Sequence, residues 1–179
     1  MVTDLVNAIQ KNLGYPPLDK VDPNSQEIKG AKKMSSAQKL PQAAIPTVLA
    51  AMIKYSDGTD GINLLTLNEN KNWLETFYGE KKKDAIKKVA DYAELSADEA
   101  QRNMEDISTE AVRLVRESIK SANAEKLRSY MNSQRHTILS HLPAVLKIGD
   151  TLNEETFDDR TNKMEGPVSS FLHKIENRI

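Results

Sequence analysis

Residues 40–55, LPQAAIPTVLAAMIKY, form the longest nearly uncharged apolar run in a chain that is otherwise rich in Lys and Glu. Apolar residues recur at helical spacing, and alanine and isoleucine fill the remaining faces, so the run is apolar almost all the way round. A bilayer span needs roughly 20 apolar residues, whereas this run is shorter and contains Pro41 and Pro46. The stretch therefore predicts a buried central helix, which Pro46 either kinks or begins.

The composition of the 179 residues indicates a helical protein with an aliphatic core. Only 5% of the residues are aromatic, which favours helix-on-helix packing over a sheet sandwich. The net charge of −1 provides no overall field to attract nucleic acid or anionic lipid. The absence of Cys excludes disulfides, thiolate metal sites and a Cys nucleophile, and the first residues contain no secretion signal, so we expect a cytoplasmic protein.

The segments around the central run predict one helical domain, residues 1–179, with a long connection near its start. Apolar spacing indicates a short helix that ends at Gly14. Residues 15–34 contain three prolines and few apolar groups, which fits either an ordered surface loop or a flexible tether. The pairs Trp73/Phe77 and Leu74/Tyr78 lie four residues apart, and we interpret them as local core rather than as a platform for stacking bases.

The sequence of residues 81–148 predicts three helices that form two successive helical hairpins. Ser96 and Glu99 have the spacing of a capping box, which begins the helix that follows the lysine-rich helix at 81–93. Apolar residues at steps of four and three continue to Ser118, and a matching stripe runs from Leu127 to Ile148. We expect these two stripes to pack against each other as an antiparallel hairpin, interrupted by Pro143.

Two short elements repeat the order apolar, Pro, small, Val, Leu: residues 45–49 and residues 142–146. Residues 110–112 occupy the analogous place in the middle helix without the proline. The repeat predicts an all-α, multi-helix bundle of pseudo-repeated helical hairpins, with kinked core helices that contain proline.

Over roughly residues 40–148 the chain resembles the YidB-like family of small bacterial helical proteins. The resemblance rests on both Pro-Val-Leu elements and on the following residues between them: Phe77-Tyr78-Gly79, Val89-Ala90, Ala93, Leu95-Ser96 and Ala100. The chain departs from the family pattern at Glu94, where a turn Gly would stand, and at Glu110, where the middle Pro would stand. The resemblance implies an all-helical bacterial protein and carries no catalytic residue to this chain.

The carboxyl-terminal part, residues 152–179, predicts an acidic segment followed by an amphipathic helix. Thr151 and Glu154 have capping-box spacing, and the acidic residues between 154 and 165 form either a solvated face or a cation site. Gly166-Pro167 then starts the last helix. Its apolar face is the candidate interaction surface, for a protein partner or a second copy of the chain: Val168, Phe171, Leu172, Ile175 and Ile179.

The sequence contains no catalytic motif, so we expect no catalytic, cofactor-binding or metal-binding residues and interpret the chain as a non-catalytic interaction or assembly module. One alternative is a helix-turn-helix nucleic-acid-associated protein, although the second helix offers only Arg102 and Asn103 as base readers among carboxylates. Another is a carboxylate-metal enzyme. Asp57 and Asp60 suggest an ordinary turn rather than a calcium loop, and His136 and His141 lie five apart, which is too far round a helix to chelate.

Overall fold

The computed structural model of the protein describes residues 3–67 and 71–158. Within these ranges the chain is helical and contains no strand. The helices are α1 (Leu5–Leu13), α2 (Ser36–Asp57), α3 (Asn63–Thr66), α4 (Trp73–Tyr78), α5 (Lys82–Ala93), α6 (Ala97–Ser118), α7 (Ala124–Leu139) and α8 (Ile148–Leu152). Short 3₁₀ turns are Ala31–Lys33, Gly79–Lys81, Ala144–Leu146 and Glu155–Phe157. The predicted all-α, multi-helix bundle is confirmed.

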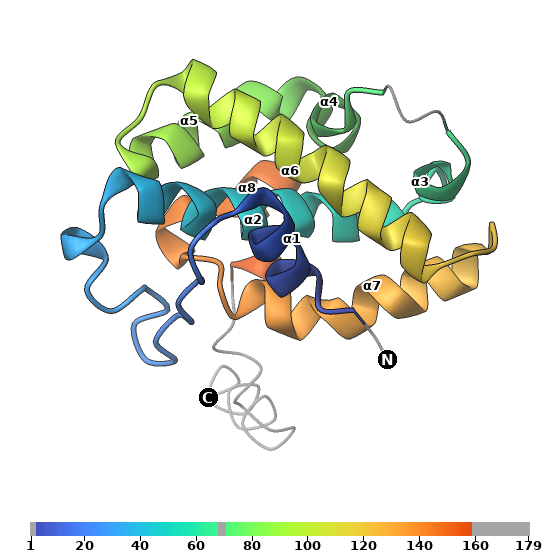
Figure 1. Cartoon of the computed structure of the whole chain (residues 1–179), viewed down its shortest axis with the longest axis horizontal. Coiled ribbons are helices and arrows are strands. Elements are labelled where there is room, and N and C mark those ends of the chain that lie inside the picture. Colours follow the sequence, from blue (N-terminus) through green and yellow to red (C-terminus); the bar gives the residue numbers. More distant parts are fainter. Residues whose placement is uncertain (1–2, 68–70, 159–179) are drawn as a thin grey trace, which may run out of the picture.

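Helix α2 is the centre of the bundle, as the apolar run predicted. Figure 1 shows it crossing the middle of the molecule, and α1, α4, α5, α6, α7 and α8 all pack on it. Nearly every side chain from Lys39 to Ile53 is buried, because neighbours cover α2 on all sides. Pro41 and Pro46 both lie inside the helix, which begins at Ser36, so Pro46 does not mark its start. Buried apolar side chains from Leu5 to Phe157 belong to one core cluster.

The expected hairpin between α6 and α7 is wrong. Helix α6 packs on α2, α5, α1, α4 and α3, whereas α7 packs on α2 and α1. Helix α1 bridges the two: Asn12 donates to Glu110 on α6 at 2.7 Å, and the Leu5 amide donates to Gln134 on α7 at 3.0 Å. The physical reason is that α2 is apolar all round, so it can cover both stripes at once and hold α6 and α7 apart.

The second proline element also differs from the expectation, because it is not helical. Helix α7 ends at Leu139, and Pro143 has extended backbone angles of φ −62° and ψ 130°. A 3₁₀ turn follows and ends at Lys147, whose φ of 46° lies in the left-handed region. Residues 45–49 and 142–146 therefore share a pattern without sharing a structure.

Residues 15–34 form a loop that is hydrogen-bonded to other parts of the molecule. The Val21 amide donates to the Ser140 carbonyl at 2.8 Å, and the Ala144 amide donates to the Gln26 carbonyl at 3.1 Å. Near the start of the loop, the Tyr15 hydroxyl donates to Asn103 on α6 at 2.7 Å. These bonds hold the loop against α6 and against the segment that follows α7.

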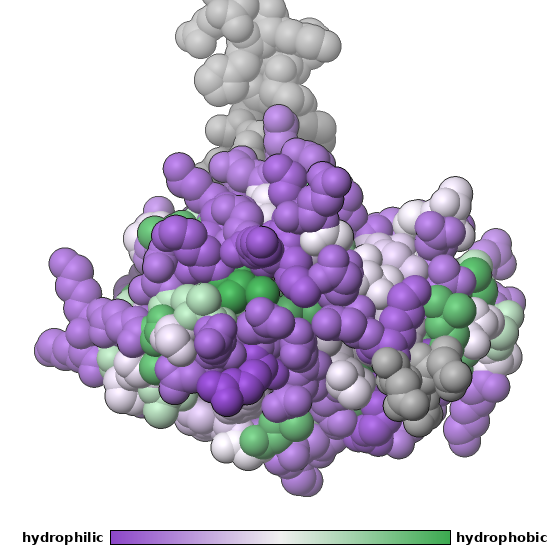
Figure 2. Space-filling view, turned by 90° about the horizontal axis from the view of Figure 1, so that it is seen from above, coloured by the Kyte–Doolittle hydropathy of each residue, from purple (hydrophilic) through white to green (hydrophobic). Residues whose placement is uncertain are grey.

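The helical surface is largely polar. On the face shown in Figure 2, hydrophobic residues appear only in small groups separated by hydrophilic ones. Val145, with 60% of its surface exposed, is the one large apolar side chain classed as exposed within the described ranges. No helix in this part of the chain combines the length and apolarity that a membrane crossing requires.

Candidate functional site

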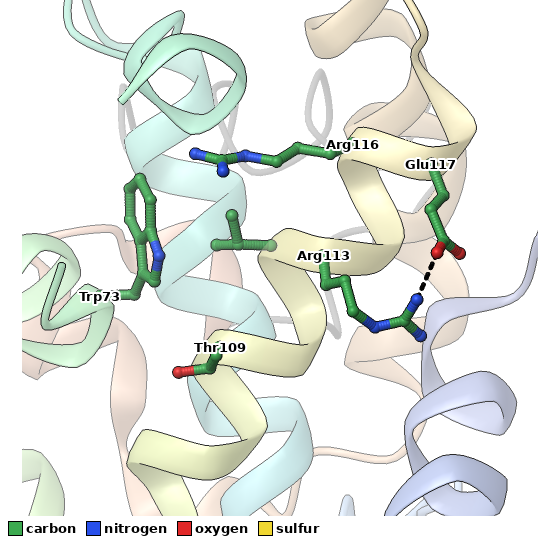
Figure 3. Close-up of a pocket in the computed structure, with 6 residues that line it drawn as sticks. Trp73, Thr109, Arg113, Arg116 and Glu117 are labelled. Carbon is green, nitrogen blue, oxygen red and sulfur yellow. Dashed lines mark hydrogen bonds and ion pairs between the residues drawn. The ribbon is translucent and has the colours of Figure 1, made fainter. Parts of the chain in front are cut away.

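A pocket of about 350 Å³ lies between α4 and α6 (Figure 3). Thr109 and Arg116 of α6 point toward the single Trp of the chain, which lies on α4, whereas Arg113 and Glu117 point away from it. Trp73 and Val112 are buried, whereas the other side chains reach the surface. The lining residues, which we call the Trp73 pocket, are Trp73, Thr109, Val112, Arg113, Arg116 and Glu117.

Arg116 is held over the indole of Trp73 by main-chain oxygens around α3. Its Nε donates to the Leu64 carbonyl at 2.6 Å, and its Nη2 donates to the carbonyl of Leu67. The guanidinium carbon lies 5.4 Å from the centre of the indole ring, within the range of a cation–π contact. Two independent interactions therefore fix the position of this cation.

Arg113 lies one turn earlier in α6 and has a different environment. Its Nε and Nη2 donate to Glu110 at 2.8 and 2.6 Å, and its Nη1 donates to Glu117, the contact drawn in Figure 3. The bonds from Arg113 hold the pKa of Glu110 below its ordinary value. Carboxylates on its own helix thus compensate the charge of Arg113.

The sequence predicted Trp73 and Phe77 as local core, and both are buried, with ring centres 6.0 Å apart. Sequence reasoning missed Arg116 as a pocket residue. The available signal was its spacing from Thr109 and Val112 on one face of α6, but the carbonyls that hold it come from a distant segment.

The last described residues fold back on α7 and α8 in a clasp formed by residues 154–158. The Asp158 carboxylate accepts the amides of Gly149 and Asp150, both at 2.8 Å. A Cβ at Gly149 would lie 2.5 Å from the Asp158 side chain, so the close approach depends on this glycine. The side chain of Phe157 is fully buried. Arg135 on α7 covers the Phe157 ring at 4.6 Å.

Part of the predicted acidic cluster, including Glu154 and Asp158, lies in the clasp. Residues 155–157 form a 3₁₀ turn, and Glu154 accepts the Thr156 hydroxyl at 2.6 Å while Asp158 caps amides. These carboxylates therefore act as hydrogen-bond acceptors within the fold. Asp159 and Glu165 lie outside the described residues. In the ranges 3–67 and 71–158, no group of three or more His, Asp or Glu side chains is arranged to hold a metal ion.

The expected capping box at Thr151 and Glu154 is wrong, because Thr151 lies inside α8. Its hydroxyl instead donates to Asp84 on α5 at 2.6 Å and accepts from Lys88 Nζ at 2.7 Å. This hydroxyl lowers the pKa of Asp84, as does the neighbouring Lys88 ammonium. The cluster fastens α8 to α5, since Lys88 and Asp84 also form an ion pair at 3.3 Å.

The two residues considered for reading DNA bases, Arg102 and Asn103, both form hydrogen bonds within the protein. Arg102 Nε donates to the Asp98 carbonyl at 3.3 Å, and Asn103 donates to the Glu99 carbonyl at 2.8 Å. The Asn103 side-chain oxygen also accepts the Tyr15 hydroxyl. A duplex would have to displace these bonds before either side chain could contact a base edge.

The remaining candidates are two histidines, two aspartates and the predicted interaction residues. His136 lies on α7, whereas His141 follows the end of that helix, and its Nδ1 lies 2.9 Å from the Asp19 carbonyl. Asp57 ends α2, and Asp60 lies in the turn that follows. The predicted interaction residues lie outside the described residues: Val168, Phe171, Leu172, Ile175 and Ile179.

Comparisons with known proteins add no homologue to these observations. No protein-family model, no curated protein and no solved structure matches the chain.

Proposed function

We propose that the chain is a non-catalytic interaction module that binds a protein partner or a second copy of itself through its terminal amphipathic segment. The observation that carries the proposal is the clasp, which fixes the chain at Asp158, several residues before the Gly166-Pro167 at which the amphipathic helix is expected to start. The cysteine-free composition supports a cytoplasmic setting for this module. The resemblance to the YidB-like family belongs to the same proposal and supplies the expectation of a bacterial source.

The clasp supports this function because it anchors the chain to the bundle ahead of the terminal segment. Arg135 both covers the Phe157 ring and donates to the Thr156 hydroxyl at 2.6 Å, so it holds two neighbouring side chains of the clasp. A binding element that starts from a fixed point loses less freedom on association than one on a long tether. The sequence beyond it has the apolar spacing of a helix that a partner groove can accept.

The test compares two aspartate substitutions in the full-length chain. Phe171→Asp places a charge in the apolar face, whereas Ser170→Asp places the same charge on the opposite side of the expected helix. We expect Phe171→Asp to abolish association, because charge at the centre of an interface is strongly unfavourable, and Ser170→Asp to retain it. Sedimentation measures self-association, and capture from the native host lysate measures binding to another protein.

Thermal melting of the same variants completes the test. We expect the unfolding midpoints of both variants to stay close to that of the unsubstituted chain. If Phe171→Asp instead lowers the midpoint strongly, the segment belongs to the core of its own domain, because a charge has been buried there. A Phe171→Asp variant that is unchanged in sedimentation, capture and melting would also contradict the proposal.

A further inference from the structure

The Trp73 pocket contains a positive charge without a carboxylate to balance it among the described residues. Both assigned acceptors of Arg116, the carbonyls of Leu64 and Leu67, are neutral. Arg113, one turn earlier in α6, instead binds two glutamates of the same helix. The Arg116 charge is therefore available to an anion that enters the pocket.

The indole N–H of Trp73 is a second hydrogen-bond donor in the pocket. Figure 3 shows its ring nitrogen on the side that faces α6, and within residues 3–67 and 71–158 no acceptor is assigned to it. Of the Arg116 donors, Nη1 has no acceptor assigned within residues 3–67 and 71–158, and the end of a guanidinium can bind the two oxygens of a single planar anion. Carboxylate is the organic anion with this geometry.

The size and charge of the pocket further restrict the kinds of ligand that it can bind. A volume of about 350 Å³ is suited to a small molecule, and small-molecule sites combine apolar walls with a few polar groups. Val112 and the indole provide the apolar walls. Glu117 is paired with Arg113, so Arg116 is the one cation of the lining without a carboxylate partner among the described residues, and one positive charge suits an anion with a single negative charge.

We propose that the Trp73 pocket binds a small organic monocarboxylate with a flat apolar body, whose carboxylate bonds to Arg116. The carbonyls of Leu64 and Leu67 hold the guanidinium in place before the ligand arrives, so little side-chain freedom is lost on binding. This site is separate from the terminal segment of the proposed interaction function. Either can fail without the other.

The experiment uses benzoate as the probe and the fluorescence of Trp73 as the signal. Trp73 is the single Trp of the chain, so any change in emission reports on this pocket. We expect a saturable change with benzoate. Benzamide, which has the same shape but no charge, and inorganic phosphate, which has no apolar body, should leave the emission unchanged.

Three variants locate the site. Arg116→Gln should weaken benzoate binding about tenfold or more, because a charge-assisted hydrogen bond is lost. Arg102→Gln is the matched control, because it removes an arginine of the same helix that lies outside the pocket lining, and it should keep the affinity. Thr109→Phe should block the pocket while it leaves Arg116 in place, which provides a second test if Arg116→Gln fails to fold.

Three results would overturn the proposal. One is an equal response to benzamide, which would mean that charge is not recognised. Another is unchanged benzoate affinity in folded Arg116→Gln, and a third is unchanged affinity in Thr109→Phe.

Discussion

Residues 45–49 and residues 142–146 have the same sequence pattern and opposite structures. The first element lies inside α2, and its valine, Val48, is fully buried. The second forms an extended residue and a 3₁₀ turn, and its valine, Val145, is 60% exposed. A five-residue pattern that contains proline therefore does not decide between helix and turn. The surroundings of the element decide.

The difference arises from where the backbone hydrogen bonds go. In the second element, the Val145 amide donates to the Glu27 carboxylate at 2.7 Å, and the preceding amide donates to the Gln26 carbonyl. The loop at residues 15–34 thus supplies acceptors that a helix would otherwise provide. The first element is enclosed by apolar neighbours that offer no such acceptors, so its amides must bond within the helix.

The largest effect should come from Leu49→Ala in the first element. Leu49 is fully buried under helices on several sides, so the truncated side chain leaves a cavity that cannot collapse, and we expect a loss of about 2–5 kcal/mol. Urea denaturation measures the free energy of unfolding. The corresponding Leu146→Ala in the second element should cost less, because the adjoining loop can move into the space. Equal losses would contradict this ordering.

An intermediate effect is expected for Gln42→Leu, which breaks the polar link between the two elements. Gln42 is fully buried in α2, and its amide nitrogen donates to the His141 carbonyl at 2.8 Å, next to the second element. Its side-chain oxygen accepts the Asp19 amide from the loop at 2.9 Å. Leucine has a similar volume but leaves the Asp19 amide and the His141 carbonyl unpaired. The free energy of unfolding should therefore fall by about 1–3 kcal/mol.

Hydrogen exchange locates the effect of this substitution. Amides of the loop, such as that of Val21, should exchange faster in Gln42→Leu, while those of α5 and α6 should change only with global stability. Uniform acceleration throughout the chain would mean that Gln42 supports the whole bundle rather than the link between α2 and the loop.

Features set by neighbouring residues were predictable from the sequence. The run at residues 40–55 is apolar on all faces, which is sufficient to identify the central helix. The Ser96 hydroxyl accepts the Glu99 amide at 3.2 Å, and Glu99 bonds back to Ser96, as the capping box predicted. The turn before it requires a left-handed residue, and Glu94 adopts that conformation with a φ of 58° while it pairs with Lys39 at 2.9 Å.

Features set by distant residues were not predictable. An apolar stripe shows that a helix buries one face, but not which helix covers it, so the partners of α6 and α7 were assigned wrongly. The Trp73 pocket depends on carbonyl groups of Leu64 and Leu67, about fifty positions before Arg116 in the sequence. Main-chain oxygens are present at every residue, so no sequence pattern marks the ones that hold Arg116.

The smallest effect should come from Val145→Thr, and its contrast with Val48→Thr measures the difference between the two elements most directly. Threonine has nearly the shape of valine but adds a hydroxyl. At Val145 the hydroxyl meets water, so we expect a change within about ±0.5 kcal/mol. At Val48 the hydroxyl must be buried, which costs about 1–3 kcal/mol without a new partner. Urea denaturation of both variants provides the comparison. A loss of stability at Val145 as large as that at Val48 would mean that this exposed valine is covered in solution, and a second copy of the chain would then be the first occupant to examine by sedimentation.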